Sequence, residues 1–411
     1  MYARHLYFFI LIIIFNIHSN KSDSNSLQCK DENGDPVDWY VLYKLPKVAE
    51  SSEPLIRKGL AYLYITNKTI DLGWQLSKKE IGSKDSVPGK TLSLLYKDNI
   101  ASKKGWIMYS DQAPNENSAK RYGHAKGIVM TDEHQGFWLI HSVPNYPPSP
   151  LSGEQKRKKH SLENFKNVTN DIPDGEYLYP NSGKSNGQSF LCISMNADQM
   201  DIVGRLLIYN QVIPYRYNMP EDLTTQYPAL LNASKAIRIK TPPYYHKKEI
   251  HSSQGLEFIS FAKSDKWQKD LYDDFVAPQL QSDLLAETWL NGRGKLPSEC
   301  NGSKVYNVQS ILLNNINIDF KSTRDHSKWA VAMSNKQQRN WVCIGDINRA
   351  DTQFNRGGGT VCVNLLKLWN NYRSSVNDIE PCPKKQNFFQ KSMTSIKSWF
   401  GNIVKKISMT E

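Results

Sequence analysis

The sequence predicts a globular fold that is built on β-sheet and divided into two related halves. Two observations predict it: a His-x-Lys motif followed by an aliphatic segment occurs once in each half, and an aromatic, β-branched run bounded by prolines lies near the N-terminus. Of the 411 residues, 39% are hydrophobic and 22% are charged. This composition can bury one large core or two fused cores, and it gives no reason to expect global disorder.

The first 19 residues have the pattern of a secretory signal peptide. Arg4 supplies an early positive charge, an apolar run extends from Leu6 to Phe15, and the small residue Ser19 follows. A membrane span is the alternative, but ten apolar residues fall short of the roughly 20 that a spanning helix needs. We therefore expect residues 1–19 to be removed and the mature chain to enter the secretory pathway, with a lysosomal or extracellular destination.

The cysteines and glycosylation sequons agree with that route. An even number of cysteines in an oxidising compartment predicts three disulfides and no free thiol. No Cys-x-x-Cys pair occurs, so the spacing gives no support to a zinc site. Asn-x-Ser/Thr sequons, which mark candidate N-glycosylation sites, begin at Asn67, Asn167, Asn232 and Asn301.

The chain is basic, with a formal net charge of +12 at pH 7. A basic surface attracts polyanions by releasing their counterions, although it also serves plain solubility. Seven histidines remain after residues 1–19 are removed. Their protonation in an acidic compartment would raise the charge and strengthen phosphate binding.

Strand and loop signals give a coarse division of the chain. The run Val37–Tyr43 between two prolines predicts a strand of a central sheet. The proline-rich residues 144–150 and the charged stretch 153–163 predict surface loops, and the basic run in the latter suits a DNA contact as well as a solvated loop. A softer junction lies around Pro214–Asn232, near the midpoint of the mature chain. We expect an N-terminal half at residues 29–215, a C-terminal half at 216–382 and a tail at 383–411.

The tail predicts a basic amphipathic helix. Apolar residues recur there at three- and four-residue steps, with lysines among them. Docking of this helix on its own domain is one interpretation, and contact with a membrane surface or a partner is the other. The apolar positions are Phe389, Met393, Ile396, Phe400, Ile403 and Ile407.

The two His-x-Lys motifs are the strongest functional signal. His124 and Lys126 form the first motif, and His326 and Lys328 form the second. Each motif runs into aliphatic residues, and after a polar turn an apolar segment opens with tryptophan, so each half is expected to form a β-hairpin. Residues i and i+2 of a strand point to the same face, so each motif would present an imidazole and an ammonium together.

This pairing suits cleavage of a phosphodiester. One imidazole can attack phosphorus and become a phosphohistidine, while the other donates a proton to the departing oxygen and the lysines neutralise the non-bridging oxygens. No metal is needed. A single His-x-Lys would usually be an exposed strand face, but two in matched settings favour catalysis. Asn145 and Asn348 follow the histidines at nearly equal distances and can donate amide hydrogen bonds to phosphate oxygens.

With these motifs in this order, the chain resembles the deoxyribonuclease II family, whose fold resembles that of phospholipase D superfamily enzymes with both halves in one chain. The resemblance implies an α/β (α+β) fold of two pseudo-symmetric phospholipase D-like halves, each a mixed β-sheet flanked by helices, with the active site at their interface. It covers about Cys29 to Cys382. Its specific segments are Val37–Tyr40, Tyr43–Pro46, Tyr109–Gln112, Gly123–Gly127, His141–Asn145, Asp325–Trp329, Gly345–Arg349 and Arg356–Gly359.

The resemblance implies an acid, metal-independent endonuclease without a cofactor, which cuts double-stranded DNA and leaves 3′-phosphate and 5′-hydroxyl ends. Both His-x-Lys pairs would meet in one site, where His326 and His124 share the nucleophile and general-acid roles. The resemblance favours His326 as the nucleophile, but the sequence alone does not separate the two roles. Ser142 would help to bind phosphate or orient the histidines. The activity should be bell-shaped against pH, with two apparent pKa values that belong to the coupled pair. Among fifteen possible pairings, the implied disulfides are Cys29–Cys192, Cys300–Cys382 and Cys343–Cys362.

Two features depart from the superfamily pattern. Its usual aspartate five residues after the lysine is replaced by Thr131, which precedes Asp132, in one half and by Met333 in the other. Another residue must then orient the histidines, and Asp346 is the candidate. The tail beyond Cys382 is longer than the family leads us to expect, so no role is carried over to it.

Two other functions would use the same features. A phospholipase D-like lipid hydrolase would employ the same histidines, but the altered aspartate pattern argues against it. A secreted protein that only binds DNA or a receptor would be expected to lack a catalytic residue, whereas both motifs are intact. The sequence leaves base preference, activity on RNA and oligomeric state open.

Overall fold

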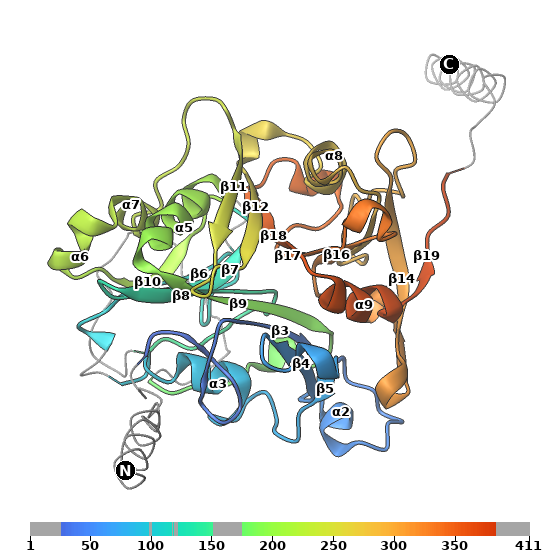
Figure 1. The fold of residues 1–411 in the computed structure, drawn as a ribbon, viewed down its shortest axis with the longest axis horizontal. Coiled ribbons are helices and arrows are strands. Elements are labelled where there is room, and N and C mark those ends of the chain that lie inside the picture. Colours follow the sequence, from blue (N-terminus) through green and yellow to red (C-terminus); the bar gives the residue numbers. More distant parts are fainter. Residues whose placement is uncertain (1–25, 98–100, 117, 119–121, 151–174, 384–411) are drawn as a thin grey trace, which may run out of the picture.

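Two β-sheets, one from each half of the sequence, form the core of the protein (Figure 1). The predicted signal peptide, the charged stretch at 153–163, Asn167 and the predicted tail helix lie outside the described residues, and they stay predictions. The computed structural model describes residues 26–97, 101–116, 118, 122–150 and 175–383.

Within the described ranges the first sheet has eight strands, and its neighbouring strands all pair antiparallel. The hairpin predicted after the first His-x-Lys motif is confirmed as β7 and β8. In spatial order the strands are β10 (Pro214–Asn218), β6 (Gly105–Ser110), β7 (Lys126–Thr131), β8 (Gln135–His141), β9 (Gln188–Asn196), β3 (Trp39–Lys44), β4 (Tyr62–Thr66) and β5 (Gln75–Leu76).

The second sheet is mixed, because β13 and β14 run parallel while its other pairs are antiparallel. The second predicted hairpin is confirmed as β16 and β17. The order is β11 (Tyr245–His251), β12 (Glu257–Lys263), β18 (Gly358–Asn364), β17 (Trp341–Gly345), β16 (Trp329–Ala332), β13 (Leu284–Glu287), β14 (Val305–Leu313) and β15 (Ile318–Lys321), with β19 (Val376–Ile379) also paired to β14.

The same five-stranded arrangement occurs in both sheets. The order β6-β7-β8-β9-β3 in the first sheet corresponds to β13-β16-β17-β18-β12 in the second, and all these neighbours are antiparallel. In each case the strand that follows a His-x-Lys motif, β7 or β16, has the same position in the order. The repeat seen in the sequence is therefore a repeat of structure.

Helices flank the sheets, so the predicted α/β (α+β) class is confirmed (Figure 1). The longest helix of the described residues, α5, packs against β8 and β9 of the first sheet and against β11 and β12 of the second. Helix α9 packs against β14, β16 and β17. In the part of the chain that the structure describes, the α-helices are α2 (Pro54–Lys58), α3 (Val87–Leu92), α5 (Ala197–Tyr209), α6 (Glu221–Gln226), α7 (Pro228–Ser234), α8 (Ala277–Leu280) and α9 (Leu366–Ser375).

The two sheets share one apolar core. Val41 and Ile193 of the first sheet belong to the same buried cluster as Trp329 and Val361 of the second. Separate clusters cover the opposite face of each sheet. The packing therefore has one layer shared by the two sheets and a further cluster on the other face of each, and the shared layer fixes the position of one sheet relative to the other.

Two local details differ from the sequence expectation. The strand predicted at 37–43 is divided, because β2 (Pro36–Val37) ends before Asp38 and β3 begins after it. The buried Asp38 carboxylate accepts hydrogen bonds from the Ser252 and Ser253 hydroxyls at 2.6 and 2.8 Å, so it joins the two halves. The segment 214–232, where the sequence predicted a softer junction, contains β10, α6 and most of α7.

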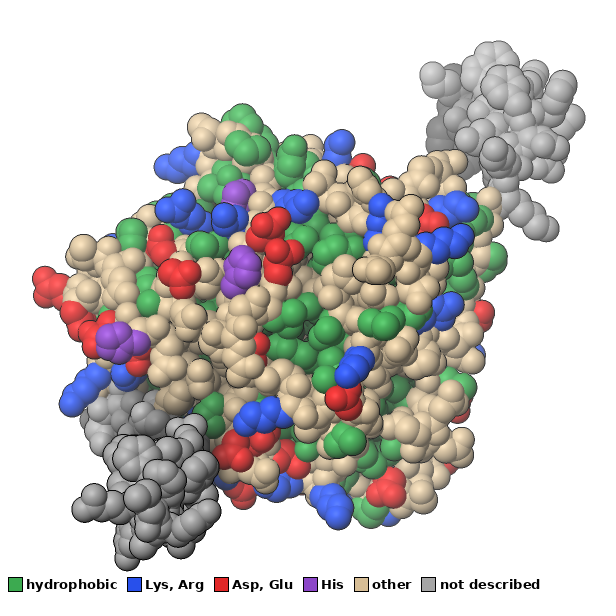
Figure 2. Space-filling model, viewed as in Figure 1, with side chains coloured by type: hydrophobic (Ala, Val, Ile, Leu, Met, Phe, Trp, Pro, Cys, Tyr) green, Lys and Arg blue, Asp and Glu red, His purple; other side chains and the backbone are tan. Residues whose placement is uncertain are grey.

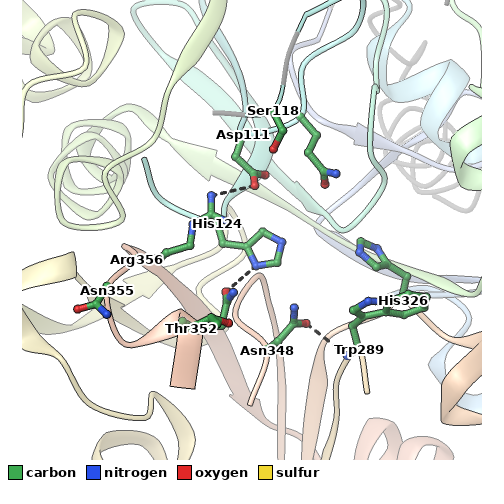
Figure 3. A pocket seen from close by; sticks show the side chains of 11 residues that line it. Asp111, Ser118, His124, Trp289, His326, Asn348, Thr352, Asn355 and Arg356 are labelled. Carbon is green, nitrogen blue, oxygen red and sulfur yellow. Dashed lines mark hydrogen bonds and ion pairs between the residues drawn. The ribbon is translucent and has the colours of Figure 1, made fainter. Parts of the chain in front are cut away.

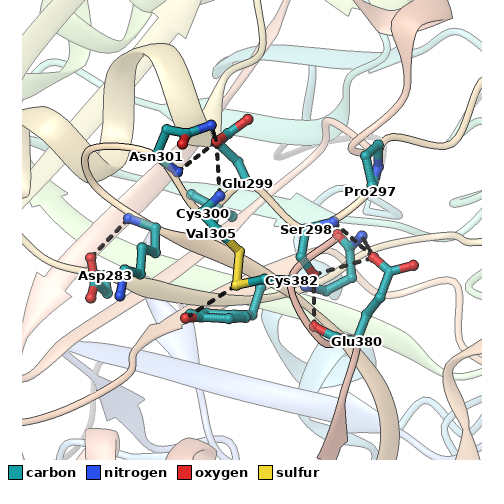
Figure 4. Close-up of a disulfide and its surroundings, with 12 residues drawn as sticks. Asp283, Pro297, Ser298, Glu299, Cys300, Asn301, Val305, Glu380 and Cys382 are labelled. Carbon is teal, nitrogen blue, oxygen red and sulfur yellow. Dashed lines mark hydrogen bonds between the residues drawn. A yellow bond between two sulfur atoms is a disulfide. The ribbon is translucent and has the colours of Figure 1, made fainter. Parts of the chain in front are cut away.

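Three disulfides stabilise the fold, and their pairing is the one that the resemblance implied. Cys29–Cys192 connects β1 (Cys29–Lys30) to β9, and Cys343–Cys362 connects the neighbouring strands β17 and β18. Cys300–Cys382 holds the segment after β19 (Figure 4), where the Glu380 carboxylate also accepts from the Asn307 amide at 2.6 Å. Cross-links over long stretches of chain restrict the unfolded state most.

The described surface mixes charges of both signs. On the face shown in Figure 2, Lys and Arg side chains are interspersed with Asp and Glu and do not gather in one block. A bilayer-spanning helix would need greater length and apolarity than any helix in the described ranges has.

Candidate active site

A pocket of about 420 Å³ lies where the two halves meet (Figure 3). His124 of the first half and His326 of the second both project into it. The structure thus brings together two side chains that the sequence predicted to meet. Its lining residues are Asp111, Gln112, Ser118, His124, Trp289, His326, Asn348, Thr352, Gln353, Asn355 and Arg356.

The histidines lie just before their strands, although the sequence placed them on strands. β7 begins at Lys126, and β16 begins one residue after Lys328. Each histidine backbone instead bonds to the opposite half: the His124 N–H donates to the Gly357 carbonyl at 2.8 Å, and the His326 N–H donates to the Gly187 carbonyl at 2.9 Å. These bonds between the halves replace the sheet pairing that the motifs alone suggested.

The His326 ring has a defined orientation. Its Nδ1 lies 3.0 Å from the Ser142 carbonyl oxygen and 3.1 Å from Gln188 Oε1. A carbonyl oxygen only accepts, so Nδ1 carries the proton, and Nε2 holds the lone pair in the neutral ring. Trp289 packs edge-on against the ring at 5.2 Å between centroids, and Lys328 Nζ lies 3.2 Å from both ring nitrogens.

His124 is buried beside a cluster of charges. Its Nδ1 lies 2.7 Å from Gln353 Oε1. The Asp111 carboxylate accepts from Lys126 Nζ at 2.6 Å and from Arg356 Nη2 at 2.9 Å. Lys126 is thus held beside the imidazole by a buried ion pair.

Burial and neighbouring cations oppose protonation of both imidazoles. Burial lowers the pKa of His124, and Lys126, Lys328 and Arg356 lower it further, whereas Asp111 raises it. Burial also lowers the pKa of His326, with Lys328, Lys126 and His124 acting in the same direction. Both histidines therefore hold a proton only in more acidic solution than a free imidazole does.

The two site aspartates differ in charge state. Burial raises the pKa of Asp346 to about 8, although Lys126 and Lys328 lower it. Burial also favours neutral Asp111, but Lys126, His124 and Arg356 outweigh it and hold that pKa below its ordinary value. Asp111 is therefore an anion and Asp346 a neutral acid under acidic conditions.

Asp346, which the sequence put forward as the orienting group, has no hydrogen bond to either imidazole in the described part of the chain. Its Oδ1 accepts from the Lys126 backbone N–H at 3.3 Å. The groups at the histidine Nδ1 atoms are instead Gln353, Gln188 and the Ser142 carbonyl. The buried Asp346 carboxyl is held by the backbone N–H of Lys126. The two residues are far apart in the sequence, so spacing along the chain could not show this contact.

The other predicted phosphate-binding residues differ in their position relative to the pocket and in their hydrogen-bond partners. Asn348 lines the pocket, and its Oδ1 accepts from the Trp289 backbone N–H at 3.3 Å. Asn145 is outside the pocket lining, and its amide donates to the Ala113 carbonyl at 3.1 Å. The Ser142 hydroxyl donates to Gln188 Oε1 at 2.6 Å, so its carbonyl, not its hydroxyl, faces His326.

Among the side chains that contact the two histidines or join the Asp111 ion pairs, sequence reasoning assigned no role to Asp111, Gln188, Trp289, Gln353 and Arg356. Asp111 and Arg356 fall within segments that carried the family resemblance, which was an available signal. The two glutamines and the tryptophan have no motif around them. Within the described ranges, no group of three or more His, Cys, Asp or Glu side chains could hold a metal ion.

Comparisons with known proteins place the chain in a family. The deoxyribonuclease II family model matches residues 28–382. Plancitoxin-1 of Acanthaster planci is 35% identical over 365 residues, covering 87% of this chain and 93% of that protein. Cell-death-related nuclease 7 of Caenorhabditis elegans is 34% identical over 388 residues (93% and 94%), and deoxyribonuclease-2-alpha of Mus musculus is 34% identical over 366 residues (87% and 94%).

The chain therefore belongs to the deoxyribonuclease II family, and the resemblance drawn from its motifs is confirmed. By that membership it is a nuclease enzyme of the deoxyribonuclease class.

Proposed function

We propose that the protein is an acid, metal-independent endodeoxyribonuclease that hydrolyses double-stranded DNA through a phosphohistidine and leaves 3′-phosphate and 5′-hydroxyl ends. One observation carries the proposal: His124 and His326, from opposite halves, project into one pocket, each with Nδ1 against a side-chain amide oxygen. That arrangement directs both Nε2 atoms toward the space where a phosphate would bind.

In the first step, Nε2 of neutral His326 attacks phosphorus and the bond from phosphorus to O5′ breaks. Protonated His124 donates its Nε2 proton to O5′, which leaves as the 5′-hydroxyl. The phosphoryl group, still joined to the 3′ side of the DNA, is now on His326. Lys328 and Lys126 offset the negative charge of the non-bridging oxygens, and the Asn348 amide can donate to one of them.

In the second step, His124 is neutral and accepts a proton from water. The water oxygen bonds to phosphorus, the bond between phosphorus and His326 Nε2 breaks, and the 3′-phosphate is released. His124 is protonated again, so the cycle closes with one water consumed.

The lowered pKa values of both histidines support an acidic optimum. The reaction needs one protonated and one neutral imidazole. Because burial and the site lysines lower both pKa values, the protonated partner is lost at a pH below that of an ordinary histidine, about 6.5. Activity should therefore fall before neutrality is reached.

The test is nicking of supercoiled plasmid by purified protein in EDTA, at about pH 5 and across the acid to neutral range. We expect nicking in EDTA, ends that polymerase extends only after phosphatase treatment, and loss of nicking in His326→Ala and His124→Ala. Absence of nicking by the wild type, a requirement for metal, or undiminished nicking by His326→Ala would contradict the proposal.

We further propose that the chain follows the secretory route to the lysosome or the cell exterior. Three disulfides suit an oxidising compartment, and the sequon residues Asn232 and Asn301 are exposed. Asn67 is partly buried, and its side chain accepts from the Asp38 backbone N–H at 3.0 Å. N-terminal sequencing of the mature protein and a mass shift on glycosidase digestion test the processing.

A further inference from the structure

Each half of the chain supplies a glutamine that contacts the histidine of the other half. Gln353, which ends the 3₁₀ turn Asp351–Gln353 of the second half, contacts His124 of the first half. Gln188, which opens β9 of the first half, contacts His326 of the second half. Both glutamines are buried, with 8% and 1% of their surfaces exposed. Each meets the histidine at Nδ1, the nitrogen away from the reacting position.

We propose that Gln353 and Gln188 are positioning residues of the reaction, and that their uncharged oxygens, standing where a carboxylate would fit, confine activity to acid pH. This inference rests on the proposed function of the two histidines. It adds the residues that set ring orientation and the pH range.

Both glutamines are themselves held in place. The Gln353 backbone carbonyl accepts from Lys263 Nζ at 2.8 Å, and its N–H donates to the Ala350 carbonyl at 2.9 Å. Gln188 Oε1 accepts from the Ser142 hydroxyl at 2.6 Å as well as facing His326. A fixed acceptor at Nδ1 selects the Nδ1–H tautomer and turns Nε2 toward the pocket.

The charges around the rings explain why an uncharged acceptor matters. His124 is faced by Lys126, Lys328, Arg356 and His326, and by one carboxylate, Asp111, which is already paired with Lys126 and Arg356. An amide oxygen orients the imidazolium but does not compensate its charge. A carboxylate at the same point would compensate it and raise the histidine pKa.

The cations around His326 are Lys328, Lys126 and, when protonated, His124. Here too the acceptors at Nδ1, Gln188 Oε1 and the Ser142 carbonyl, are uncharged. The two histidine rings therefore have the same kind of surroundings, with nearby cations and an uncharged acceptor at Nδ1. The glutamines that supply these acceptors come from unrelated local sequences. A change from amide to carboxylate at either glutamine alters charge while keeping size.

The test compares Gln353→Glu and Gln188→Glu with wild type. Histidine pKa values are measured by NMR titration, with each resonance assigned by its loss in the His124→Ala or His326→Ala protein. We expect the adjacent histidine to titrate about one pH unit or more higher in each variant. The pH profile of kcat/KM should respond differently in the two variants, because the histidines have different roles.

Gln353→Glu should shift the alkaline limb of the kcat/KM profile to higher pH, since His124 then keeps its proton at higher pH. Gln188→Glu should shift the acidic limb of that profile to higher pH. His326 must lose its proton to attack, and a raised pKa means that it does so only at higher pH. The charge control is Gln226→Glu, exposed on α6, which should change neither limb. The size control is Gln353→Met, which should lower kcat roughly ten- to hundredfold with little change in KM and no upward shift of the alkaline limb.

The outcomes separate this inference from the proposed function. If wild type does not cut DNA, the proposed function fails, and the NMR titrations still decide whether the glutamines control the histidine pKa values. Thermal unfolding first establishes that both Glu variants are folded. If the wild type cuts DNA but both folded variants keep the wild-type histidine titration midpoints and both limbs of the kcat/KM profile, the inference is wrong. If Gln353→Glu does not fold, Gln188→Glu and Gln353→Met give the deciding result.

Discussion

The Asp111 carboxylate lies 2.6 Å from the Lys126 ammonium, and both side chains are almost fully buried. The same carboxylate accepts from Arg356 Nη2 at 2.9 Å. Three charged groups from two halves thus meet beside His124. Because a buried charge without a partner is strongly destabilising, this cluster connects the stability of the interface between the halves to the electrostatics of the site.

Asp111→Asn should lower the free energy of unfolding by roughly 3 kcal/mol, because it leaves the Lys126 and Arg356 charges without their carboxylate. The folded pKa of Asp111 is below its ordinary value, so the ion pair contributes fully above the unfolded pKa of about 3.9 and is lost as pH falls below it. Urea unfolding at several pH values measures this. Asp319→Asn, on an exposed part of β15, is the control. An equal loss of stability in both variants would contradict the assignment.

Asp346→Asn should make the protein less sensitive to pH between about 4 and 8. Burial raises the folded pKa of Asp346 to about 8, so the folded state binds more protons than the unfolded state and wild-type stability falls as pH rises through this window. Asparagine mimics the neutral acid and removes that slope, which is at most about 1.4 kcal/mol per pH unit. Unfolding free energies that follow the same slope in both proteins would show that Asp346 is ionised.

Lys328→Met should lower kcat about a hundredfold or more, because it removes a cation from the position where charge develops on the phosphoryl oxygens. The same change should raise the pKa of His326, since Lys328 lowers it in the wild type. Single-turnover kinetics and NMR titration measure the two effects. Lys321→Met, on the exposed end of β15, is the matched control. A His326 pKa that is unchanged or lowered would exclude the electrostatic contact.

Replacing both Cys300 and Cys382 by serine should lower the free energy of unfolding by roughly 2–5 kcal/mol, because the disulfide closes a loop of 82 residues in the unfolded chain. The bond lies outside the pocket lining, so kcat at low temperature should be unchanged. Chemical unfolding and a nicking assay on the same preparation test both statements. A large fall in kcat in the folded variant would mean that the disulfide also positions the site.

The sequence predicted the parts of the fold that depend on local pattern. Two apolar segments separated by a polar turn suffice to predict the β7–β8 and β16–β17 hairpins, because strand pairing across a short turn is a local event. The parallel pairing of β13 with β14 and the packing of α5 across both sheets depend on residues far apart in the chain. No periodicity in the sequence encodes such contacts.

The same distinction applies to the site. The His-x-Lys motifs could be recognised because they occur twice in similar surroundings, and the structure places both histidines in one pocket. The acceptors at the Nδ1 atoms of these histidines could not be recognised from the sequence, because Gln353 lies 229 residues from His124 and Gln188 lies 138 residues from His326. Spacing after the histidines also pointed to Asn145, which has a backbone φ of 58°, donates to the Ala113 carbonyl and is not among the residues that line the pocket.

The most direct test of the central claim is to find the phosphoryl group on His326. The 4-nitrophenyl ester of thymidine 3′-phosphate has a leaving group that needs no general acid, so His124→Ala should still transfer the nucleotide to His326 and then hydrolyse it slowly. We predict a burst of nitrophenol and, after alkaline quenching, a nucleotidyl adduct on the peptide that contains His326. No adduct, an adduct on a different residue, or an undiminished burst in His326→Ala would contradict the account.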